Sequence, residues 1–168
     1  VARRSSLLEA YQNSAYATRY RALVDEVRAA EARLWPGQDE IAKAVAQSFY
    51  KVMAYKDEYE VARLHAAPEF REQLAAQFED PSKLTFHLAP PVLSRIDQRT
   101  GRPAKSEWGG WMMTGFRFLA RFKGLRGTAF DIFGKTEERQ HERALVESYE
   151  STIRGMLAGL RSEQHAVA

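Results

Sequence analysis

Apolar residues recur three or four positions apart along most of this chain, and they alternate with polar residues in one short segment only. Helical spacing places apolar side chains on one face of an α-helix, whereas alternation places them on one face of a β-strand. The sequence therefore predicts a mainly α fold, with about five helices and one short strand or irregular hairpin around residues 84–107.

Two helices are expected in the first part of the chain. The first opens with a capping-box spacing at residues 6–9, allows an interruption near Asn13-Ser14, and ends before the proline and glycine of residues 35–37. The second begins after Asp39, a residue that can cap a helix, and its apolar face continues toward Leu64.

A third helix and the strand follow. Pro68 suits the first turn of a short helix, which we expect to end before Asp80-Pro81. The apolar period changes from helical to alternating at residues 84–88, and this change predicts a strand. Residues 95–107 are polar and basic and contain a glycine and a proline, so we expect a loop or an irregular hairpin there.

Residues 108–123 are apolar almost all round, which is typical of a helix that is buried on several sides or docks against another surface. We expect this helix to end at Gly124 and to be followed by a loop as far as Gly134. The last helix is expected to begin near Thr136, with an apolar stripe that reaches Leu160. The large apolar residues of the 108–123 segment are Trp108, Trp111, Met112, Met113, Phe116, Phe118, Leu119 and Phe122.

Length and composition set broad limits. A chain of 168 residues predicts a single helical domain, and Val1 in place of an initial methionine suggests a fragment of a longer chain. The absence of cysteine excludes disulfides, thiolate zinc sites and cysteine-held iron–sulfur clusters within this chain. No apolar run approaches the ~20 residues that cross a bilayer and no secretory segment is visible, so we expect a cytoplasmic protein with no membrane partner.

The residue types identify no catalytic, cofactor-binding or metal-binding residue. The glycines do not have the spacing of a phosphate-binding loop, and no Gly-x-Ser-x-Gly elbow is present. The four histidines are scattered rather than set at metal-ligand spacing.

Positive charge is concentrated in one segment. Residues 95–126 contain eight lysines and arginines against two acidic residues, a local charge of +6. Arginine beside tryptophan suits a protein interface or a phosphate- or base-binding surface, whereas a buried helix with a solvated rim explains the same pattern without a function. The residues predicted to make interface or anion contacts are Arg95, Arg102, Trp108, Trp111, Arg117, Arg121, Lys123 and Arg126.

A second candidate is a polar cluster. It is dense in charge on a predicted helix and could order a substrate or another chain, although charge runs on helices are more often solvated faces. A histidine on the predicted strand could act as an acid or base near neutral pH, although a lone histidine is more often hydrogen-bonded locally. The members of this cluster are Lys51, Lys56, Asp57, Glu58 and His87.

Several segments also carry a family resemblance, namely residues 16–21 (YATRYR), 50–64 (YKVMAYKDEYEVARL), 86–91 (FHLAPP), 100–103 (TGRP) and 119–128 (LARFKGLRGT). They resemble the C-terminal region of the fused indolepyruvate ferredoxin oxidoreductases, which belong to the thiamine-diphosphate-dependent 2-oxoacid:ferredoxin oxidoreductases. The likeness covers most of residues 16–160, and the segment at 50–64 is its most specific part. Ile132 stands where a proline is expected, and a further segment expected beyond Leu160 is absent, which fits a truncated chain.

This resemblance implies an enzyme that oxidatively decarboxylates an aryl 2-oxoacid such as indolepyruvate to an acyl-CoA and reduces ferredoxin. It implies thiamine diphosphate, Mg and iron–sulfur clusters for the full-length enzyme. We expect none of them to bind this fragment, which lacks both cysteine and a Gly-Asp-Gly signature.

The fragment then resembles a non-catalytic accessory domain that supports assembly or access of substrate and CoA. The implied partners are the catalytic domains of the same polypeptide, ferredoxin and CoA, within a homo-oligomer. Two alternatives from other classes remain, an autonomous nucleic-acid-binding module and a homo-oligomeric interaction module.

Overall fold

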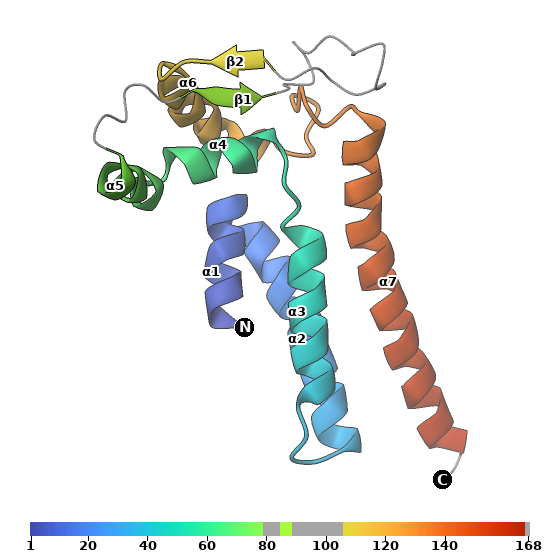
Figure 1. Ribbon diagram of the computed structural model, residues 1–168. Coiled ribbons are helices and arrows are strands. Elements are labelled where there is room, and N and C mark those ends of the chain that lie inside the picture. Colours follow the sequence, from blue (N-terminus) through green and yellow to red (C-terminus); the bar gives the residue numbers. More distant parts are fainter. Residues whose placement is uncertain (79–84, 89–105, 167–168) are drawn as a thin grey trace, which may run out of the picture. The chain divides into compact units, whose positions relative to one another are not determined.

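The computed structural model describes residues 1–78, 85–88 and 106–166 (Figure 1). Within these ranges the chain forms seven α-helices, one 3-10 helix and two short strands, so the prediction of a mainly α fold is confirmed. None of the described helices combines the length and the apolar character needed to cross a membrane.

The chain divides into two compact units. Unit 1 comprises Val1–Tyr55 and Glu137–Ala168, and unit 2 comprises Lys56–Thr136. Each unit is described by itself, and the single domain expected from the length stays a prediction.

Unit 1 contains four helices (Figure 1). The side chain of Asn13 caps α2 by accepting a hydrogen bond from the Tyr16 amide at 2.9 Å, so the predicted interruption near Asn13-Ser14 is confirmed. The capping box expected at residues 6–9 is wrong, because α1 already begins at Ala2 and residue 6 lies inside it. The helices of unit 1 are α1 (Ala2–Tyr11), α2 (Ser14–Leu34), α3 (Glu40–Met53) and α7 (Glu137–Ala166).

The start of α3 differs from the prediction in its cap. Asp39 occupies the N-cap position but makes no cap hydrogen bond, and it pairs instead with Lys43 at 2.7 Å. The carboxylate of Glu31 on α2 accepts hydrogen bonds from the amides of Ile41 and Ala42, both at 2.8 Å. Glu31 is 3% exposed, so a buried carboxylate from a neighbouring helix performs the capping expected of Asp39.

The core of unit 1 joins aliphatic and aromatic side chains from its four helices. Phe49 of α3 stacks with Tyr20 of α2 and with Tyr149 of α7, at ring-centroid distances of 6.0 and 5.4 Å. The buried Tyr20 hydroxyl donates a hydrogen bond to the Ala46 carbonyl at 2.9 Å. Burial raises the pKa of Tyr20, and Arg4 opposes that rise.

Unit 2 combines short helices with an antiparallel hairpin. The strands pair Phe86 with Trp108 and His87 with Glu107, which confirms a strand and hairpin in the 84–107 region for the described residues. The elements of unit 2 are α4 (Glu58–Ala66), α5 (Pro68–Gln77), β1 (Phe86–Leu88), β2 (Ser106–Trp108), α6 (Met112–Leu119) and the 3-10 helix η2 (Ala120–Leu125).

Two predicted helices are each divided by a break, and this accounts for the difference between five expected helices and seven. The helix predicted to run toward Leu64 stops at Met53, and Asp57 caps a new helix by accepting from the Glu60 amide at 2.8 Å. The helix predicted over residues 108–123 is also wrong at its start, because Trp108 belongs to β2. Glycines at 109 and 110 separate that strand from α6, so the helical segment is shorter than expected.

Candidate docking surface

Large aromatic side chains lie exposed on one part of unit 2. Trp111, at the N-cap of α6, is 64% exposed, and Phe118 on the same helix is 63% exposed. Phe122 on η2 is 38% exposed and contacts Phe118 edge-on, with ring centroids 5.0 Å apart. Trp111 has helical backbone angles and lies seven positions before Phe118, so both project from one face of the helix. These three residues are called the aromatic surface.

The opposite side of α6 is packed into unit 2. Phe116 is 5% exposed, stacks on His65 at 4.8 Å between ring centroids, and meets Phe86 edge-on at 5.4 Å. His65 is fixed in turn by its Nδ1, which lies 2.7 Å from the Val61 carbonyl oxygen. The inner face therefore anchors α6 while the aromatic surface remains open to solvent.

Two arginines accompany the aromatic surface. Arg117 and Arg121 are four positions apart and both exposed. Arg117 donates a hydrogen bond to Thr114 at 3.1 Å, and neither arginine forms an ion pair with a carboxylate of the described residues. A positive charge beside exposed rings suits an acidic partner with an apolar patch.

A buried ion pair supports this part of unit 2. The Arg126 guanidinium, at the end of η2, contacts both carboxylate oxygens of Asp57 at 2.5 and 2.7 Å. The side chains are 2% and 3% exposed, and Arg126 also lies over the Tyr59 ring at 5.6 Å from its centroid. This pair ties the end of η2 to the start of α4.

The loop that follows η2 is anchored by a second buried carboxylate. Asp131 accepts hydrogen bonds from the amides of Gly127 and Gly134, at 2.7 and 2.8 Å, and from the Tyr59 hydroxyl at 3.3 Å. Burial, followed by the effect of Asp131, raises the pKa of Tyr59 to about 12. On either side of Asp131, Phe130 and Ile132 are 77% and 65% exposed.

The predicted contact residues fall into three groups. Arg95 and Arg102 lie outside the described residues. The exposed group contains Trp111, Arg117 and Arg121, while Lys123 is half-buried on η2. Trp108 is half-buried, and its Nε1 is buried with no hydrogen-bond partner among the residues that the structure describes. Arg126 differs from the expectation, because its guanidinium is buried against Asp57 rather than turned toward an external anion.

The polar cluster is not assembled as a site within unit 2. Asp57 is buried and paired with Arg126, Glu58 is half-buried beside it in sequence, and Lys56 is exposed. His87 is exposed on β1, with its Nδ1 3.9 Å from a Glu107 carboxylate oxygen. Lys51 is an exposed residue of α3 in unit 1.

Sequence reasoning missed the residues that hold the surface in place. His65 had been set aside as one of four scattered histidines, yet three phenylalanine rings lie around it, those of Phe70, Phe86 and Phe116. Asp131 is flanked by apolar residues and followed by a glycine, a pattern that suits a side chain folded back onto its own loop.

The residues present do not fit the cofactors that the family resemblance implies. The chain contains no cysteine to hold an iron–sulfur cluster. In the ranges that the structure covers, no three histidine, aspartate or glutamate side chains converge as a metal site. No chemical step is therefore assigned to a cofactor on this chain.

Comparison with known proteins gives one match. A family model described as "Family of unknown function (DUF6537)" matches residues 1–168. No curated protein and no solved structure matches the chain.

Proposed function

Because the chain belongs to the DUF6537 family, whose description names no function, we propose a function from its own residues. We propose that it is a non-catalytic helical region of an indolepyruvate ferredoxin oxidoreductase, an enzyme that converts a 2-oxoacid to an acyl-CoA and reduces ferredoxin. In this proposal the aromatic surface docks on the catalytic domains of the same enzyme and supports their assembly or the access of substrate and CoA. The proposed location is the cytoplasm, where structural disulfides are rare.

The observation that carries the docking role is the exposure of Trp111 and Phe118 beside Arg117 and Arg121. Large exposed rings are costly to leave in water, and tryptophan and arginine are enriched where interfaces contribute most to binding. The family assignment depends on the resemblance of residues 50–64 and 119–128. Asp57 and Arg126, one from each of these two segments, form the buried ion pair, so the resembling residues form the scaffold beneath the surface.

The double substitution Trp111→Ala/Phe118→Ala in the full-length enzyme tests the docking role. We expect the association of the enzyme's parts, followed by analytical ultracentrifugation, to weaken at least tenfold, because each buried aromatic anchor contributes about 2 kcal/mol to an interface. Ferredoxin reduction driven by the oxoacid and CoA is expected to fall with it.

The matched control is Leu145→Ala/Met156→Ala on α7, which removes two apolar side chains that are 47% and 61% exposed. This control should keep both assembly and activity. Unchanged assembly, activity and CoA affinity in the Trp111/Phe118 variant would rule out the docking role.

The arginines beside aromatic rings also favour a second candidate, a module that binds single-stranded nucleic acid. It requires binding of an oligonucleotide whose affinity falls linearly with salt on a logarithmic plot and falls further in Arg117→Gln/Arg121→Gln. Absence of binding at low ionic strength eliminates this candidate.

A further inference from the structure

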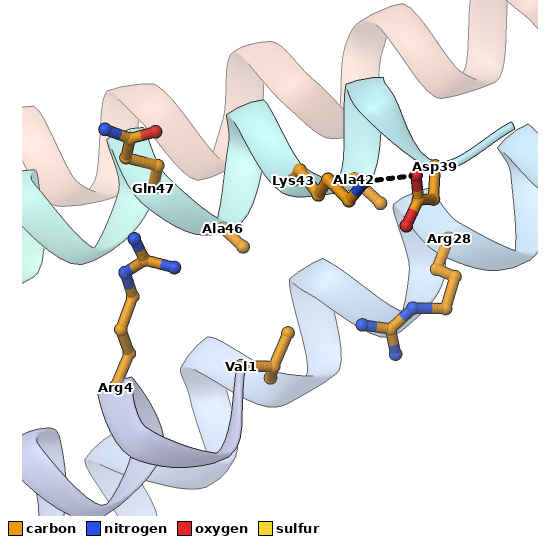
Figure 2. Close-up of a pocket in the computed structure, with 8 residues that line it drawn as sticks. All are labelled: Val1, Arg4, Arg28, Asp39, Ala42, Lys43, Ala46 and Gln47. Atoms are coloured by element: carbon orange, nitrogen blue, oxygen red, sulfur yellow. Dashed lines mark ion pairs between the residues drawn. The ribbon is translucent and has the colours of Figure 1, made fainter.

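Unit 1 contains a pocket of about 270 Å³ between α1, α2 and α3 (Figure 2). The small side chains of Ala42 and Ala46 on α3 leave room for it. Its volume lies just below the range of pockets that hold drug-sized ligands, so it suits a smaller molecule. The lining residues are Val1, Arg4, Arg28, Asp39, Ala42, Lys43, Ala46 and Gln47.

The side chains around this pocket are mainly cationic. Arg4, Arg28 and Lys43 are positive and Asp39 is negative, three charges against one and an excess of two. The three cations come from three different helices, α1, α2 and α3. Figure 2 shows the guanidinium of Arg28 reaching into the space between α2 and α3.

Arg4 is oriented without being neutralised. Its guanidinium is hydrogen-bonded to the Tyr20 hydroxyl and lies 6.0 Å from the centroid of the Tyr50 ring. Tyr20 donates its own proton to the Ala46 carbonyl, so its oxygen is free to accept from Arg4. No ion pair joins Arg4 to a carboxylate of the described residues. Its full charge therefore remains for a ligand.

The other two cations are held by exposed carboxylates. Arg28 pairs with Asp25 at 2.7 Å, and Lys43 pairs with Asp39 at 2.7 Å. All four side chains are at least half exposed, and ion pairs of this kind contribute little to stability. Both cations can therefore turn toward a ligand at low cost.

We propose that this pocket binds a small divalent oxyanion of the phosphate type, such as the phosphoryl group of a small metabolite. The planar guanidinium of Arg4 matches two oxygens of a phosphate, and Arg28 and Lys43 supply the remaining positive charge. The excess of two charges balances a doubly ionised phosphate. The amides of Ile41 and Ala42 at the start of α3 are occupied by Glu31, so recognition falls to the side chains.

Titration of the chain with inorganic phosphate, followed by NMR, tests the proposal, with sodium chloride holding the ionic strength constant. We expect saturable shifts around residues 4, 28 and 43. Arg4→Gln and Arg28→Gln should each raise the dissociation constant at least tenfold. The control Arg33→Gln, an exposed residue of α2 that does not line the pocket, should change it less than twofold.

Each outcome decides the matter. Because Arg4 also contacts the buried Tyr20, Arg4→Gln could disturb the fold, and Arg28→Gln then carries the test. Shifts that do not saturate, or equal losses in Arg28→Gln and Arg33→Gln, overturn the site. Succinate, a dicarboxylate of similar charge, should bind more weakly, and equal or tighter binding of succinate overturns the phosphate assignment.

Discussion

Replacing Arg126 with methionine is expected to lower the free energy of unfolding by about 3–5 kcal/mol, because it leaves the carboxylate of Asp57 buried without a cation. The two side chains are 2% and 3% exposed and joined by two hydrogen bonds, so no water replaces the lost partner without opening the structure. Urea unfolding followed by tryptophan fluorescence measures the loss.

Two further variants separate the buried charge from general effects of the substitution. Arg121→Met removes an exposed arginine from the same 3-10 helix and should change the stability by less than about 0.5 kcal/mol. Adding Asp57→Asn to Arg126→Met removes the orphaned charge while keeping an oxygen for the Glu60 amide, so it should restore at least half of the loss. A double variant no more stable than Arg126→Met alone would contradict this explanation.

The buried pair also explains why the sequence predicts the helical regions but not all of their breaks. The apolar period runs from α3 into α4 with little change, and it gives no sign of an end at Met53. The new helix begins at Asp57, whose partner Arg126 lies 69 positions away in the sequence. A contact of that range is invisible to a local pattern, whereas the Asn13 cap, which depends on Tyr16 only, was predictable.

The same limit applies to the candidate surface. The density of aromatic residues in 108–123 correctly predicts that some of them exceed what a small core can hold, and Trp111 and Phe118 are exposed. Which rings turn inward depends on β1 and α4, since Phe116 packs on Phe86 and His65. Charge alone likewise did not distinguish Arg126, which has a buried partner, from the exposed arginines of the same segment.

Glu31→Ala is expected to lower the free energy of unfolding by about 2–4 kcal/mol, because it leaves two backbone amides at the start of α3 without an acceptor. Both bonds, to Ile41 and Ala42, are 2.8 Å long, and the Glu31 carboxylate is almost fully buried. The matched control is Asp39→Ala at the N-cap position of the same helix.

Asp39 makes no cap hydrogen bond and forms an exposed pair with Lys43, so the control should cost no more than about 1 kcal/mol. Urea unfolding followed by circular dichroism compares the two variants under identical conditions. A larger loss from Asp39→Ala than from Glu31→Ala would show that the residue at the N-cap position, and not the carboxylate supplied by α2, fixes the start of α3. The expected order follows from burial, because solvent can replace the exposed pair of Asp39 but cannot reach the amides that Glu31 covers.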